Sequence, residues 1–175
     1  MYLISIYFDK SSRDTISRYI AKVAEVTGNT FMTDNSVPPH ITVAAFEARN
    51  DDEAREVFES VARKLEQGMI NFVSVGVFLP YVIHITPVLN EYLHNISTTI
   101  YNEISEKDNI SINRFYVPFS YMPHATIAKK LDSEQMRAAF EIMQKSFVPF
   151  NATVERIGLA KPNPHRDILM FELPM

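Results

Sequence analysis

The chain has 175 residues, 46% of them hydrophobic, and it contains no cysteine. This length fits one domain, or one domain built from two similar halves, and the absence of cysteine excludes disulfides and thiolate metal sites. The net charge of −4 argues against a large cationic surface that follows the phosphates of a polymer, although a few donors can still hold a small phosphate-bearing ligand.

The first half of the chain alternates predicted strands with amphipathic helices. Alternating apolar residues indicate strands, and apolar residues at helical spacing indicate helices. Ser11 or Ser12 is expected to cap the first helix, and Gly28 and Gly68 are expected to end the two helices. In chain order we expect a strand at 2–9, a helix at 11–28, a strand at 40–47, a helix at 51–68 and a strand at 70–79.

The second half is predicted to run through the same elements. Pro87 suits the first turn of a helix, and Asp132 can cap the next one. The chain then closes as a hairpin around "PNPHR". In chain order we expect a strand at 81–86, a helix carrying Leu89, Leu93, Ile96 and Ile100, a strand at 124–130, a helix carrying Met136, Phe140, Met143 and Phe147, and strands at 151–161 and 167–174.

This repeated order predicts a single α+β domain with an internal structural duplication. We expect two similar lobes, approximately 2–78 and 81–175, related by a pseudo-twofold axis. Each lobe would be an antiparallel sheet with helices packed outside, and a groove would separate the lobes. The start of the chain lacks the features of a signal peptide and no apolar run could span a membrane, so a cytoplasmic monomer is expected.

The pattern His-x-Thr occurs three times, in "PPHITV", "VIHITP" and "MPHATI". The first and third copies begin the strand that follows the first helix of each half, and a proline precedes each histidine. Alternate residues of a strand share a face, so His40 lies beside Thr42 and His124 beside Thr126. Two imidazoles in opposite protonation states can move protons at phosphorus, while the threonine hydroxyls hold the phosphoryl oxygens.

The second copy is predicted to have a different role. His84 lies in the first strand of its half, at the place of Ser5-Ile6-Tyr7 in the other half, and no proline precedes it. Its strand parity directs it to the groove, where it could touch a base or ribose without taking part in proton transfer. Thr86, directly before Pro87, is expected to cap the next helix.

Strand alternation and loop position indicate further candidate substrate-binding residues. Phe46 shares the predicted face of His40, so a base could stack on it, although core packing is the alternative. Lys130 shares the predicted face of His124 and could contact phosphate or simply be exposed. Arg166 and Lys161 could supply a phosphate contact from the closing hairpin.

The paired "PPHITV" and "MPHATIA" resemble the signature of the 2H phosphoesterases, which include 2′-5′ RNA ligase-like proteins and cyclic nucleotide phosphodiesterases. The resemblance covers essentially the whole chain, including the closing "VERIGLAK". It implies an enzyme independent of metal, ATP and other cofactors, acting on 2′,3′-cyclic phosphates or 2′-5′ phosphodiesters of nucleotide or RNA-end substrates. It also implies that His40, Thr42, His124 and Thr126 form the catalytic set. The lead "FYVPFSYMPHATIA" resembles the family's approach to its second motif, which would bring Tyr121 to the site.

Other classes of function remain open at this point. The fold could bind nucleotides or RNA ends without physiological turnover, or use its groove for protein interaction. A metal site is a further alternative, but each strand offers one good ligand, and no acidic residue lies two positions from either histidine. Turnover of 2′,3′-cyclic mononucleotides separates an enzyme from a binding protein.

Overall fold

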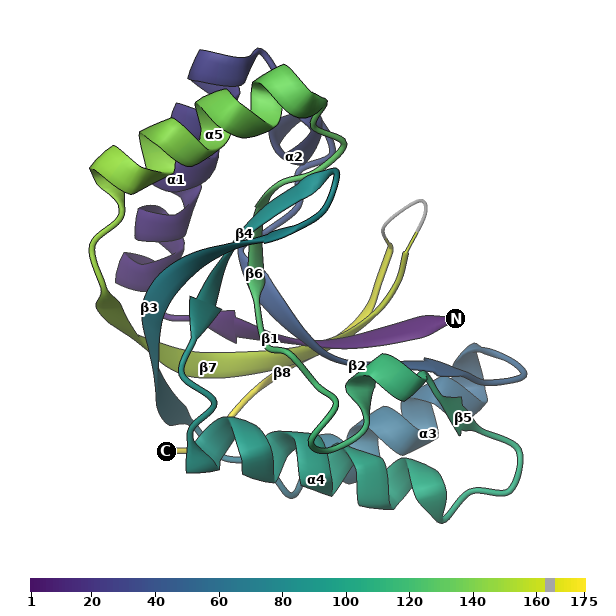
Figure 1. The fold of residues 1–175 in the computed structure, drawn as a ribbon. Coiled ribbons are helices and arrows are strands. Elements are labelled where there is room, and N and C mark those ends of the chain that lie inside the picture. The colour runs from purple at the N-terminus through teal and green to yellow at the C-terminus, as the bar shows by residue number, and fades with distance from the viewer. Residues whose placement is uncertain (163–165) are drawn as a thin grey trace.

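The computed structural model describes residues 1–162 and 166–175. Within these residues, eight strands form one antiparallel sheet, and helices pack on it from two sides (Figure 1). No described helix has the length and apolarity needed to cross a membrane. In chain order the elements are β1 (Tyr2–Phe8), α1 (Lys10–Thr27), α2 (Phe31–Asp34), β2 (His40–Glu47), α3 (Asp51–Ala62), β3 (Gly68–Phe78), β4 (Val82–Pro87), α4 (Glu91–Ser105), β5 (Ser111–Ile112), the 3₁₀ turn η1 (Arg114–Tyr116), β6 (Ala125–Ala128), α5 (Ser133–Ser146), β7 (Phe150–Lys161) and β8 (Arg166–Glu172).

The sheet is organised around the long strand β7. The strands follow the order β5-β2-β1-β7-β3-β4-β6, and β8 pairs with β7. One edge of β7 pairs with β1; its other edge pairs with β3 over Phe150–Val154 and with β8 from Arg156 onward. Apart from the two-residue β5, the strand at each end of this order belongs to a His-x-Thr motif. The order is β2-β1-β7 from one end and β6-β4-β3 from the other.

The two sequence halves exchange helices across this sheet. Helix α1 belongs to the first half but packs against α5 and β6, while α4 of the second half packs against α3 and β2. Figure 1 shows α1 with α5 on one side of the sheet and α3 with α4 on the other. The predicted α+β class with antiparallel strands and outer helices is therefore confirmed. The halves 2–78 and 81–175, however, do not fold as separate units, because each supplies a helix to the partner half's strands.

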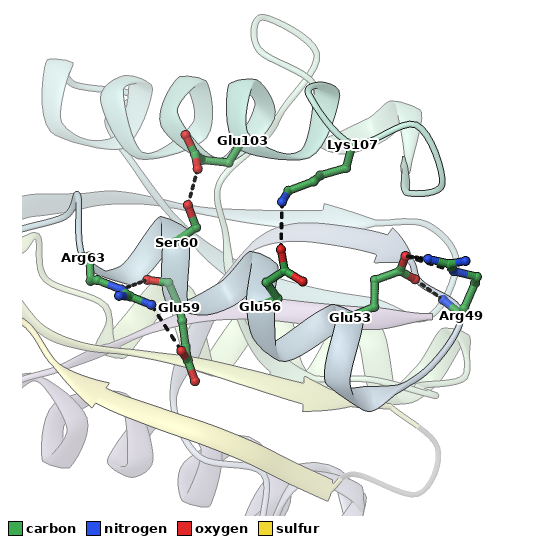
Figure 2. Close-up of polar contacts among 8 residues, drawn as sticks. All are labelled: Arg49, Glu53, Glu56, Glu59, Ser60, Arg63, Glu103 and Lys107. Atoms are coloured by element: carbon green, nitrogen blue, oxygen red, sulfur yellow. Dashed lines mark hydrogen bonds and ion pairs between the residues drawn. The ribbon is translucent and has the colours of Figure 1, made fainter.

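Apolar packing and a set of polar bridges hold α3 against α4. Val57, Phe58 and Val61 of α3 are buried, as their helical spacing predicts. Figure 2 shows two bridges between the helices: Lys107 contacts Glu56 at 3.0 Å, and the Ser60 hydroxyl donates to Glu103. Exposed ion pairs contribute only about 0–1 kcal/mol each, so the apolar face provides most of the stability of this layer.

Two predicted helix ends are wrong for identifiable reasons. Asp9, rather than Ser11 or Ser12, caps α1, because its carboxylate accepts hydrogen bonds from the backbone and the hydroxyl of Ser12 at 3.0 and 2.6 Å. Gly68 begins β3 and does not end α3. A Cβ at Gly68 would lie 2.3 Å from the ring of Tyr92, so glycine is needed there for close packing on α4.

The start of α4 also differs from the prediction, whereas other helix signals are confirmed. Pro87 ends β4, and the Asn90 side chain caps α4 by accepting from the Leu93 amide. Asp132 caps α5 as predicted, and Gly28 ends α1 in the left-handed conformation with φ of 68°. The predicted closing hairpin is confirmed by the pairing of β7 with β8, but residues 163–165 of its turn lie outside the described residues.

Candidate active site

The first His-x-Thr motif lies on β2, and its neighbour β1 defines the face that it occupies. His40 pairs with Tyr7, and Thr42 pairs with Ser5. Ser5 and Tyr7 alternate with the fully buried Ile4, Ile6 and Phe8, so the motif faces away from that apolar layer. The Ser5 and Thr42 hydroxyl oxygens lie 3.4 Å apart.

The third motif lies at the start of β6, with His124 directly before the strand and Thr126 within it. Thr126 pairs with His84 of β4, and the fully buried Ala125 and Ile127 occupy the opposite face. The strands β2 and β6 approach each other, with Cα pairs within 8 Å. The fold therefore brings the two motif-bearing strands together from distant parts of the chain. The motifs are on matched strands of the sheet order, as the repeated element pattern predicts.

Both imidazoles are held in the same way by backbone carbonyls. Nδ1 of His40 lies 2.7 Å from the carbonyl oxygen of Pro38, and Nδ1 of His124 lies 2.9 Å from that of Met122. A carbonyl can only accept, so each Nδ1 carries the proton. In the neutral ring, Nε2 is then the nitrogen with the lone pair. The contact between Nδ1 and the backbone carbonyl fixes both the orientation and the tautomer of each ring.

His84 lies directly beside His124 and is fully buried. Its ring centroid is 5.2 Å from that of His124 and 4.4 Å from that of Phe78, and its Nδ1 lies 3.1 Å from the Thr86 hydroxyl. Burial, followed by the charge of His124, lowers the pKa of His84 to about 4. Thr86 therefore contacts His84 and does not cap α4, contrary to the prediction, because Asn90 fills that position.

The electrostatic environment of His124 favours its neutral form. Burial lowers the pKa of His124, and the hydrogen bond to the Met122 carbonyl opposes this effect. Phe78 packs edge-on against the ring, with centroids 4.7 Å apart. Apolar contact of this kind removes water that would otherwise stabilise the imidazolium.

Sequence reasoning missed a cation in the row of His40. Tyr7 pairs with His40 on one side and with Arg156 of β7 on the other, so these three residues lie in one cross-strand row. The guanidinium carbon of Arg156 is 5.9 Å from the Tyr7 ring centroid. Burial and the charge of Asp167 raise the pKa of Tyr7 to about 12. Only the register of β7 against β1 reveals this neighbour, and register could not be read from the sequence.

A pocket of about 530 Å³ adjoins His124. Its walls come from β3, η1 and the segment that leads into β6, and Tyr121 and Phe78 contribute to them. Tyr121 is buried, and its hydroxyl has no hydrogen-bond partner among the described residues. The pocket is lined by Phe78, Asn113, Phe115, Tyr116, Ser120, Tyr121, Met122 and His124.

Phe46 does not share the face of His40, contrary to the prediction. The pairing of β1 with β2 passes from Ser5–Thr42 to Ile4–Ala44, so Val43 is an extra residue in β2. Such a bulge reverses the alternation of the residues that follow it. Phe46 consequently pairs with Tyr2, is 1% exposed and stacks on the Tyr2 ring at 5.7 Å between centroids. It is a core residue.

Lys130 is also displaced from its predicted place. A matching bulge follows Thr126, because the pairing passes from His84–Thr126 to Ile83–Ala128. The strand ends at Ala128, and Lys130 has a positive φ of 61°. Its ammonium lies 4.4 Å from the ring centroid of Phe31. The strand parity that related Lys130 to His124 therefore does not apply.

The closing hairpin directs its predicted cations elsewhere. Arg166 and Lys161 each lie 2.7 Å from a carboxylate oxygen of Asp51, at the start of α3. The Tyr2 hydroxyl donates to the same carboxylate at 2.8 Å. The hydrogen bond from Arg166, followed by those from Lys161 and Tyr2, holds the pKa of Asp51 well below its usual range. Arg166 thus joins the hairpin to α3.

Within residues 1–162 and 166–175, no group of three or more His, Cys, Asp or Glu side chains is arranged to hold a metal ion.

Comparisons with known proteins agree with this architecture. The fold and the two matched strands define an α+β protein whose His-x-Thr motifs lie near opposite ends of the sheet order, on strands that approach each other in space. The model of the 2′-5′ RNA ligase superfamily matches residues 13–166, so the chain belongs to this family. A search of curated proteins found no match.

Solved structures with the same fold cover nearly the whole chain. A crystal structure described as a phosphoesterase is 13% identical, covers 99% of this chain and 98% of its own, and has a TM-score of 0.67. LigT of E. coli, solved in complex with 3′-AMP, has the same identity and coverage and a TM-score of 0.66. LigT in complex with NADP⁺ is 15% identical, with a TM-score of 0.65 and the same coverage.

The carbonyl contacts predict the tautomers of both motif histidines. In their neutral forms, His40 and His124 are expected to carry the proton on Nδ1, because Pro38 and Met122 offer only acceptors there. Ring ¹⁵N shifts of histidine-labelled protein, recorded across a pH titration, measure this directly. A neutral ring protonated on Nε2 at either position would contradict the arrangement.

Proposed function

We propose that the chain is a metal-independent phosphoesterase that acts on 2′,3′-cyclic phosphate or 2′-5′ phosphodiester bonds of nucleotide or RNA-like substrates. His40 and His124 would serve as the general acid and base. Thr42 and Thr126 would donate hydrogen bonds to the non-bridging phosphoryl oxygens. The substrate would be a nucleotide or an RNA end.

The observation that carries the proposal is the matched pair of histidines at the starts of β2 and β6, two strands that approach each other. Each has its Nδ1 bound to a carbonyl two residues earlier, which leaves Nε2 for proton transfer. General acid–base catalysis by one positioned side chain contributes about 10²- to 10⁴-fold, and an in-line displacement uses two such groups. Membership of the 2′-5′ RNA ligase superfamily supports the same chemistry.

The reaction we propose on a cyclic phosphate is an in-line displacement by water. One histidine takes a proton from the attacking water while its oxygen bonds to phosphorus. The bond from phosphorus to the ribose oxygen breaks, and the other histidine gives that oxygen a proton. Charge on the phosphoryl oxygens would be met by the two threonine hydroxyls and by Arg156, which lies in the row of His40 on the far side of Tyr7. Phosphoryl transfer depends mainly on such positioning and electrostatic stabilisation.

The pocket beside His124 supports a nucleotide substrate. Phe115 is 62% exposed on its wall, and Tyr116 and Tyr121 pack together with ring centroids 6.1 Å apart. Aromatic walls accept the flat face of a base, and stacking contributes about 1–3 kcal/mol per base. The structures of LigT with 3′-AMP and with ATP support the same class of ligand for a protein of this fold.

The function is tested by a screen of 2′,3′-cyclic nucleotides and 2′-5′ dinucleotides with purified protein after exhaustive EDTA treatment. Activity should survive the chelator and follow a bell-shaped pH profile, because one histidine must be neutral and the other charged. Binding without turnover of any substrate would indicate a nucleotide-binding protein. Loss of activity with EDTA, restored by a divalent ion, would indicate a metal-dependent enzyme instead.

Substitutions of the four motif residues should divide into two classes. His40→Ala and His124→Ala should each lower kcat by at least about 10²-fold, because each removes one proton transfer. Thr42→Ala and Thr126→Ala should lower kcat by about 10- to 10³-fold, as expected for loss of one oxyanion donor. Steady-state kinetics measures both. An unchanged rate in folded His124→Ala protein would refute the acid–base assignment.

The base pocket predicts a KM effect that depends on the base. Phe115→Ala should raise KM for a cyclic nucleotide by about 5-fold or more, through lost stacking, and leave kcat nearly unchanged. KM for ribose 2′,3′-cyclic phosphate, which lacks a base, should stay the same. Phe140→Ala on α5 removes a phenyl ring that is 47% exposed and does not line this pocket, so it serves as the control. An equal rise in KM for both substrates would show that the base does not bind in this pocket.

A further inference from the structure

Ser5 and His84 occupy the same place in the two matched sets of strands. Ser5 of β1 pairs with Thr42, and His84 of β4 pairs with Thr126. On their other sides, Ser5 pairs with Gly158 of β7, and His84 pairs with Gly76 of β3. At this equivalent position the two motifs therefore have different neighbours. The small hydroxyl of Ser5 lies beside Thr42, whereas the larger imidazole of His84 lies beside Thr126.

Gly76 leaves the space in which the imidazole of His84 lies. A Cβ at residue 76 would be 2.5 Å from Cε1 and 3.0 Å from Nε2 of His84. Phe78, two residues further along the same face of β3, packs on the ring at 4.4 Å between centroids. The Thr86 hydroxyl contacts Nδ1. Glycine, phenyl ring and hydroxyl together hold the His84 ring in one position against His124.

No counter-charge accompanies His84 in this position. It is fully buried, and its Nε2 has no hydrogen-bond partner among the described residues. The titratable group facing it from β6 is His124, at 5.2 Å between ring centroids. Two imidazolium ions at this separation in a buried site would repel each other, so at most one ring is charged. His124 is partly exposed, whereas His84 is not, so a proton taken up by this pair goes to His124, and His84 stays neutral in either state of His124.

Apart from His40, the remaining groups that face His124 are uncharged. Phe78 packs against it from β3, and the pocket on its other side presents Tyr116 and Tyr121. Burial raises the pKa of both tyrosines, so they stay protonated at neutral pH. His40, which can carry a positive charge, lies on β2, the strand that approaches β6. Among the described residues, no carboxylate forms a hydrogen bond or ion pair with His124 that would stabilise its charged form.

We propose that His84 is a positioning residue that excludes water beneath His124 and so keeps His124 in the neutral state of a general base, leaving His40 as the acid. This inference rests on the proposed function and deepens it. During hydrolysis His124 takes the proton of the attacking water, and His40 gives its proton to the departing ribose oxygen. His124 then returns its proton to solvent and His40 regains one, so the cycle balances.

The decisive measurement is the pKa of His124 itself, from ¹³C- or ¹⁵N-histidine NMR titration of the full chain. His84→Ser installs the side chain found at the equivalent position of β1. It should admit water and raise the pKa of His124 by about half a unit or more, since desolvation is the effect removed. Gly76→Ala should do the same by displacing the ring. His84→Phe keeps a ring beneath His124 and should not raise its pKa.

Kinetics provides the second readout. The rising limb of the pH profile of kcat/KM reports the base, so it should move to higher pH in His84→Ser and Gly76→Ala by the same amount as the NMR pKa. Above this limb, kcat of His84→Ser should stay within a few-fold of wild type, and KM should change by no more than about 10-fold.

Several outcomes would overturn the inference. An unmoved His124 pKa in folded His84→Ser and Gly76→Ala proteins would refute it, as would a rising limb that follows the pKa of His40. A collapse of kcat comparable to that of His40→Ala would make His84 a direct participant. A wild-type protein without turnover would refute the proposed function alone, because the NMR titration tests the role of His84 without any substrate.

Discussion

The antiparallel pairing of β7 is the interaction on which the rest of this structure depends. β7 is the only described strand that pairs with members of both matched sets, β1 on one edge and β3 on the other, with Val154 paired on both sides. Each set then continues outward to its His-x-Thr strand. Because a backbone amide or carbonyl cannot be left unpaired in a buried sheet, this pairing fixes which face each motif occupies. The approach of β2 to β6 follows from the folding of one continuous sheet.

The sequence was sufficient to predict the features that depend on local alternation. The α+β class, the long strands and the helix caps at Asp132 and Gly28 all follow from periodicity and capping chemistry acting over a few residues. The placement of each histidine beside its threonine is of the same kind. The exchange of α1 and α4 between the halves could not be predicted, because it depends on which apolar faces meet in space.

The bulges after Thr42 and Thr126 explain why the predicted positions of Phe46 and Lys130 were wrong. The alternation of side chains between the two faces of a strand holds only while the pairing is regular. One inserted residue reverses it for the residues that follow. Phe46 and Lys130 both lie beyond such an insertion, so both were assigned to the wrong surroundings. The same bulges have a use at the motifs. They allow Val43 and Ile127 to remain in the apolar layer, at 1% and 0% exposure, while the polar pair before each stays on the other face.

The matched strands also impose a chemical problem that their symmetry cannot solve. Two identical histidines in identical surroundings would have the same pKa, and acid–base catalysis of a displacement needs one to be neutral while the other is charged. The backbone contacts do not distinguish them, because both Nδ1 atoms bind a carbonyl two residues earlier. The residues on the flanking strands do distinguish the two histidines. Arg156 and Tyr7 lie in the row of His40, whereas Phe78 and the neutral His84 surround His124. Differentiation of the two motifs therefore comes from the neighbouring strands β1, β3, β4 and β7, and not from the motifs themselves.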